Sequence, residues 1–224
     1  MKKIALSIFA TLLFHASENA TAQSVNWRSL KSDQPHIADL HVGLDNGFIA
    51  GIGYGHKLKI KQPALINAEF SIPFGKNLTD DFKAKLGGGA EVARIENVSF
   101  SVGVHGIFRR YQSELVRLAG FGSEFVAVAG YYRPKWYVAG EFGFDKAIIT
   151  HIKNSPIMKE YYPGGQDGWY IPTGGNFFYG IKSGLSIKNC ELYVKMGKTI
   201  SEDLKTTATL PVYCQVGANV KFNL

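Results

Sequence analysis

Hydrophobic and polar residues alternate along much of this chain, which is the pattern of a β-strand with one apolar and one polar face. The clearest stretch is at the C-terminus, where every second residue from Leu210 to Leu224 is hydrophobic. The residues between them include Tyr213, Gln215, Gly217, Asn219 and Lys221. The same alternation recurs at 64–74, 98–109, 136–145 and 177–187.

The alternation and the turn residues between its segments predict ten strands. Their expected ranges are 37–44, 48–58, 63–74, 82–93, 98–109, 121–132, 136–148, 176–187, 191–198 and 210–223. The first two strands are joined by residues 45–47, where a three-residue hairpin with glycine at its left-handed position fits.

The expected connections alternate in length. Residues 94–97, 133–135 and 188–190 form tight turns, whereas 75–81, 110–120, 149–175 and 199–209 form longer loops. Residues 45–47 and 59–62 fit this alternation less well. Short turns on one side and long loops on the other are typical of an outer-membrane barrel with its short turns in the periplasm.

The first 22 residues have the pattern of a secretory signal peptide. Lys2 and Lys3 precede a short apolar stretch at 4–14, and Ala20-Thr21-Ala22 offers a small-x-small cleavage site. The apolar stretch is too short to span a bilayer. We therefore expect a signal peptide at 1–22, a lead-in at 23–36, a barrel domain at 37–224, and export.

The polar faces of the strands carry full charges, although only 19% of the chain is charged. A membrane barrel turns its polar face toward the lumen, so we expect these charges to pair inside it. The expected acidic residues are Glu69, Glu91, Glu124 and Glu141, and their expected partners are Arg109, Lys182 and Lys195.

Aromatic residues gather at the strand ends of the apolar face. Two aromatic girdles with an aliphatic band between them are expected at the membrane interfaces. The girdle beside the long loops would contain Phe48, Phe74, Phe82, Phe108, Phe121, Phe144 and Phe177. The girdle at the opposite end would contain Tyr131, Trp136 and Phe222.

These features predict an all-β fold: a closed antiparallel up-and-down transmembrane β-barrel of about ten strands, with eight or twelve as alternatives. A soluble exported barrel is the rival fold, because alternation alone does not say which face is inside. From residue 37 to the end, the chain resembles the small single-chain outer-membrane β-barrel proteins of bacteria. The features that carry this resemblance are the signal peptide, the alternating strands and the terminal strand from Val212. The resemblance implies the outer membrane as location, its lipid as partner, and recognition of the last strand by the barrel-assembly machinery. That family usually ends in an aromatic residue, whereas here Asn223 and Leu224 follow Phe222.

Charge and cysteine content limit the function further. Loss of the signal peptide would lower the formal net charge from +7 to +6, and no dense basic cluster suggests nucleic-acid binding. Cys190 is expected at a turn and Cys214 on an outward face, so we do not expect a disulfide. No Cys/His spacing predicts a metal site, and no cofactor is expected.

The sequence favours a protein without catalytic activity. Barrels of this kind that are proteases use an Asp–His dyad at the external rim. Asp39 and His41 are the right residue types for such a dyad, but they are expected in the periplasmic half of the barrel. Asp80 and Asp81 are adjacent rather than alternate. Asp145 and His151 remain as weak candidates.

Three functions stay open. The first is a structural or surface-interaction barrel with a plugged lumen, the second is a narrow channel for small solutes or ions, and the third is a hydrolase with its site at the rim. Side chains largely fill a lumen of about ten strands, which favours the first. The aromatic-rich loop at 150–175 is expected to pack over the mouth or to meet an extracellular ligand of unknown nature.

Overall fold

The computed structural model describes residues 25–30, 33–45, 47–74, 80–172, 174–203 and 211–223. The predicted signal peptide lies outside these ranges, as do parts of the loops at 75–81 and 199–209. The strands are β1 (His36–Leu44), β2 (Phe48–Lys57), β3 (Ala64–Pro73), β4 (Asp81–Ile95), β5 (Val98–Gln112), β6 (Val116–Tyr132), β7 (Trp136–Asn154), β8 (Gly168–Tyr170), β9 (Gly175–Ile187), β10 (Cys190–Ser201) and β11 (Val212–Phe222).

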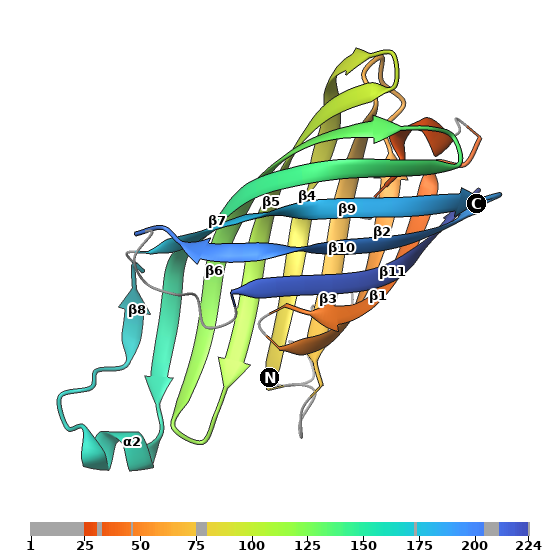
Figure 1. Ribbon diagram of the computed structural model, residues 1–224. Helices are drawn as coiled ribbons and strands as arrows, with labels where there is room; N and C mark the ends of the chain where they lie inside the picture. The colour runs from red at the N-terminus through yellow and green to blue at the C-terminus, as the bar shows by residue number, and fades with distance from the viewer. Residues whose placement is uncertain are drawn as a thin grey trace.

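Ten of these strands form one closed antiparallel barrel (Figure 1). Each strand pairs with its neighbour in the chain, apart from β8, and β1 pairs with β11 along nine residues to close the sheet. The short β8 lies outside the ring and pairs only with the outer part of β7. The predicted fold class is confirmed, and the alternatives of eight and twelve strands are wrong.

The two ends of the barrel differ. At the turn end, where β1 begins and β11 ends, the strands are joined through 58–63, 96–97, 133–135 and 188–189. At the loop end, β6 and β7 are the longest strands, and β7 leads into α2 (Pro156–Tyr161) and β8 (Figure 1). The 3₁₀ turn η2 (Trp27–Ser29) precedes β1. No helix in the described part of the chain is long and apolar enough to cross a membrane.

Two of the expected long loops are wrong. The ladder between β5 and β6 continues to Gln112 and Arg117, so residues 113–115 form a tight turn where a loop at 110–120 was expected. The expected loop at 149–175 begins as strand, because β7 extends to Asn154. The apolar alternation ends at Phe108 and Phe121 although the hydrogen-bonded ladder does not. The alternation in the sequence therefore indicates where a strand faces an apolar environment, and it does not indicate where the strand ends.

The apolar faces of the strands point away from the barrel axis. Val138 and Ile181 are 45% and 55% exposed, whereas Glu141 and Lys182 on the same two strands are 4% and 5% exposed. A soluble barrel would have the reverse distribution, so the soluble alternative is wrong. An apolar exterior around a charged interior is the architecture of a membrane-spanning barrel.

The expected interface aromatics lie on this outer face in two groups. At the loop end, Phe82, Phe108 and Phe121 form a chain of ring contacts with centroids 5.7 and 4.9 Å apart, and Phe144 contacts Phe177. Phe48 and Phe74 are exposed at the same end. At the turn end, Tyr131 contacts Trp136, and Phe222 stacks on His36.

Candidate functional site

The middle of the lumen contains ion pairs that link near-neighbour strands of one wall. Glu141 on β7 lies 3.1 Å from Nζ of Lys182 on β9 and 3.4 Å from Nζ of Lys195 on β10. The Tyr213 hydroxyl on β11 donates to the same carboxylate at 2.8 Å. The carboxylate therefore has partners from three strands, as a buried charge requires.

A second cluster fills the wall opposite. Lys85 on β4 contacts Glu124 on β6 at 2.7 Å, and His105 on β5 lies 3.2 Å from the same carboxylate. Asn67 on β3 contacts His105 at 2.5 Å. Together the two clusters place charged or titratable side chains from six consecutive strands inside the barrel.

A third cluster joins β1 to β10. The His41 ring lies 2.6 Å from Asp39, and the Tyr193 hydroxyl donates to Asp39 at 2.8 Å. Glu69 lies 3.9 Å from the other ring nitrogen of His41. Both members of the Asp39–His41 pair are buried inside the wall, so the pair does not form a site at the rim.

The structure contains some of the expected ion pairs and replaces others. Glu141 pairs with Lys182 and Lys195, as expected. Glu91 instead pairs with Arg94 on its own strand, and Arg109 pairs with Asp81 at 3.4 Å. The reason is register: these side chains meet the nearest inward charge on their own or the adjacent strand, which alternation alone does not identify.

The expected list of lumenal charges also missed Lys85 and Glu191. A signal was present for both, because Lys83, Lys85, Gly87, Gly89 and Glu91 share one alternate set. Likewise, Glu191 falls on the same face as Tyr193 and Lys195. Extending each polar face to its strand ends would have found them.

Glycines provide the space for the large inward side chains. A Cβ on Gly143 would lie 2.1 Å from the Phe178 ring, and one on Gly51 would lie 2.2 Å from the His41 ring. Each ring thus packs against the adjacent strand at a position where only hydrogen fits. This packing accommodates aromatic and imidazole rings inside a narrow lumen.

The lead-in segment closes the turn end. The backbone N–H of Asn26 donates to the Glu191 carboxylate at 3.0 Å, and Lys221 reaches that carboxylate at 2.7 Å. Val25 packs with Ile37 and Leu65, while Trp27 also contacts the stacked Tyr132 and Tyr137. Glu191 and Asn26 have no exposed surface. The 25–30 segment is therefore held inside the mouth of the barrel.

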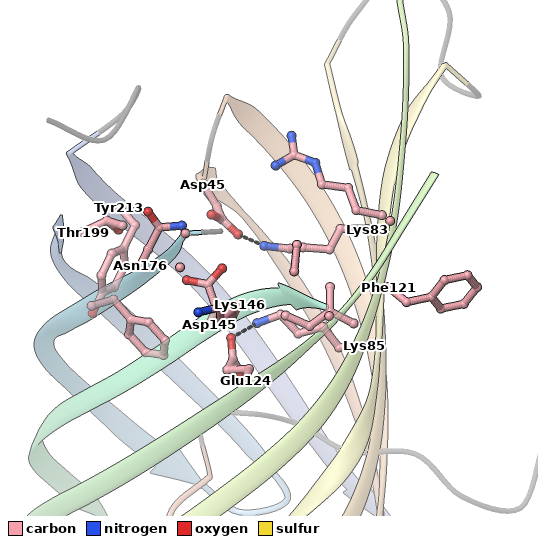
Figure 2. Close-up of a pocket in the computed structure, with 18 of the residues that line it drawn as sticks. Asp45, Lys83, Lys85, Phe121, Glu124, Asp145, Lys146, Asn176, Thr199 and Tyr213 are labelled. Atoms are coloured by element: carbon pink, nitrogen blue, oxygen red, sulfur yellow. Dashed lines mark hydrogen bonds and ion pairs between the residues drawn. The ribbon is translucent and has the colours of Figure 1, made fainter. Parts of the chain in front are cut away.

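The loop end contains a cavity of about 580 Å³. Figure 2 shows Asp45 directed at Lys83 and Lys85 directed at Glu124, while Phe121 points away from the cavity. Asp45 lies in the turn beyond β1, where burial alone would raise its pKa. The ammonium groups of Lys83 and Lys85 reverse this effect and hold the pKa of Asp45 at about 2. A further space of about 60 Å³ lies deeper, and Glu124, Phe178 and Lys195 line both.

The weak catalytic candidates are not brought together. Asp145 lines the loop-end cavity, whereas the His151 ring packs on Trp169 of β8 at 4.9 Å. Six residues of extended strand place their backbones about 20 Å apart. A direct Asp145–His151 dyad is therefore excluded.

Cys190, at the start of β10, and Cys214, in β11, are both free. Among the described residues, no group of three or more His, Cys, Asp or Glu side chains is placed to hold a metal ion.

Comparison with known proteins gives likeness of fold only. No protein-family model matches the chain, and no curated protein matches it. Among solved structures, a KdgM porin in complex with disordered oligogalacturonate is 10% identical, with a TM-score of 0.44, and the match covers 84% of this chain and 99% of that one. The β domain of the Bordetella autotransporter BrkA is 8% identical, with a TM-score of 0.38 and coverage of 86% and 100%.

Proposed function

We propose that this protein is a bacterial outer-membrane β-barrel with a plugged lumen, which serves a structural or surface-interaction role rather than transport. The expected cleavable signal peptide would direct its export. The observation that carries the proposal is the double obstruction of the lumen. Paired charges from both walls project into its middle, and the 25–30 segment occupies the turn end.

Energetics support a lumen that stays closed. Opening a path through the middle would separate Glu141 from Lys182 and Lys195, all of which are buried. Breaking one buried pair by removing a partner costs about 3–5 kcal/mol. At the turn end, the Glu191 contacts and the apolar packing of Val25 and Trp27 would also have to be lost.

The loop end supports the surface role. Tyr161, Tyr162, Trp169 and Ile171 are all more than half exposed around α2 and β8. Exposed aromatic groups of this extent mark contact surfaces. In the proposed orientation the extended β5–β7 region carries them outside the cell.

A narrow channel is the second candidate, and one observation favours it. The cavity at the loop end and the smaller space beneath it share three lining residues, so little protein separates them. The two candidates differ in whether water and ions pass the paired charges and the 25–30 segment.

Conductance across planar bilayers decides between them. The folded protein, whose insertion is checked by heat-modifiable gel mobility and vesicle flotation, should give no discrete current steps. A variant that lacks residues 25–30 and carries Glu141→Ser, Phe178→Ser, Lys182→Ser and Lys195→Ser should give such steps, which shows that the assay detects an open barrel. Discrete steps from the unaltered protein would reject the plugged lumen and support the channel.

A further inference from the structure

Cations gather on the outer face of the strands just beyond the aromatic girdle. In β5, Arg110 and Gln112 share the outward face with Phe108. Two cross-strand rows continue this face. The first row is Arg110, Ala119, His151 and Trp169, and the second is Gln112, Arg117 and Lys153.

The two arginines of this face converge on one neutral oxygen. Arg110 donates to Oε1 of Gln112 at 3.0 Å, and Arg117 donates to the same atom at 2.8 Å. Lys153 is the direct cross-strand neighbour of Arg117. Within the described ranges, no carboxylate lies within ion-pair distance of Arg110, Arg117 or Lys153, and Nε of Arg110 is buried without a hydrogen-bond partner. Three like charges on one face without a carboxylate favour the binding of an anion.

The depth of the cluster identifies the source of the anion. Arg110 and Gln112 lie about 7 and 13 Å beyond Phe108 along the strand. Phe108 belongs to the girdle that marks the edge of the hydrocarbon layer, so the cations stand at the level of the lipid headgroups. Trp169 completes the outer edge of the cluster with an aromatic face suited to that level.

We propose that Arg110, Arg117 and Lys153 bind the phosphate of an outer-leaflet lipid headgroup, with acyl chains running down past Phe108 and Phe121. Guanidinium groups match phosphate geometry by paired N–H donation, and Lys153 adds a point charge. The inference rests on the membrane placement proposed above. It assigns a ligand to the outer surface of β5–β7. This ligand is independent of whether the lumen is closed.

Native mass spectrometry of the folded full-length protein in a non-ionic detergent tests the site. The probes are bis-phosphorylated lipid A, the same lipid after dephosphorylation, and inorganic phosphate. The unaltered protein should retain one phosphorylated lipid, and Arg117→Gln with Lys153→Gln should weaken that binding at least about tenfold. Lys61→Gln with Lys135→Gln removes two exposed charges at the turn end of the barrel and should leave binding unchanged.

Several results would overturn the inference. Equal retention of the dephosphorylated lipid would mean apolar contact alone, and inorganic phosphate bound as tightly as the lipid would mean a site for free anions. Equal loss in the control variant would mean a nonspecific effect of net charge. Heat-modifiable mobility and vesicle flotation are measured for every variant. Failure of the unaltered protein to insert would reject the membrane proposal itself, whereas insertion without phosphate preference would reject only the lipid site.

Discussion

The buried charges of this barrel have most of their partners on other strands rather than on their own. Glu141 shows the principle, since its partners Lys182, Lys195 and Tyr213 come from three other strands. A buried charge without partners carries a large desolvation cost, so the carboxylate and its cations depend on one another. The strength of such a contact follows from burial rather than from its distance alone.

Neutralising Glu141 tests this dependence. Glu141→Gln should lower the free energy of unfolding by about 3–5 kcal/mol, because it leaves Lys182 and Lys195 buried beside a neutral group. Urea titration of the protein folded in lipid vesicles, followed by gel mobility, measures the change. The control is Glu202→Gln, which removes the half-exposed partner of Lys146 at the rim and should cost less than about 1 kcal/mol. Equal costs for the two variants would mean that burial in the lumen does not strengthen the pair.

Strands of unequal length distinguish the two ends of the molecule. β5, β6 and β7 continue well past the aromatic girdle, and their ladder stays intact to Gln112 and Asn154. Beyond Phe108 the outward residues become cationic and polar, because these strand segments have left the hydrocarbon layer. A β-bulge between Phe121 and Gly122 shifts the register of β6 against β7 where the strands extend beyond the ring.

Cysteine labelling tests the orientation of these elements. In a background of Cys190→Ser and Cys214→Ser, Leu115→Cys at the β5–β6 turn should react with a membrane-impermeant maleimide on intact cells. Lys188→Cys, at the β9–β10 turn, should react only after the cells are permeabilised. The physical reason is that the two turns lie at opposite ends of a bilayer-spanning barrel. Labelling of Lys188→Cys alone on intact cells would show the reverse orientation.

The whole molecule depends on closure of the sheet between its first and last strands. β1 and β11 are far apart in the chain but pair along nine residues, including Val42 with Val216. Closure removes the unpaired strand edges that hydrocarbon would not tolerate. The seam is therefore the contact that turns ten strands into a membrane-compatible structure.

An engineered disulfide tests the register of the seam. In the same cysteine-free background, Val42→Cys with Val216→Cys should form an intramolecular disulfide on mild oxidation, because the residues are direct cross-strand partners. The altered mobility of the denatured chain on a non-reducing gel reports the bond. Val42→Cys with Val220→Cys is the mismatched control, since Val220 lies opposite Ala38. Crosslinking of the mismatched pair alone would show a different register.

The sequence by itself determined the fold class, the number of strands and which face of each strand is apolar. These properties are local, because the alternation within one segment, such as Val212 to Phe222, directly indicates the apolar and the polar face of that strand. It also indicated the aromatic girdles and placed Glu141, Lys182 and Lys195 on the polar faces of their strands. Each of these follows from spacing along a single strand.

Only the tertiary structure decided which charges meet and what fills the ends. Glu124 meets Lys85, and Glu191 meets the lead-in at Asn26, because strand register and barrel closure bring them together across the lumen. The sequence pattern also did not predict how far β5–β7 extend beyond the girdle, because their backbone hydrogen bonding continues after the apolar alternation ends. Contacts between distant residues depend on the closed geometry, and period-two spacing within one strand does not encode that geometry.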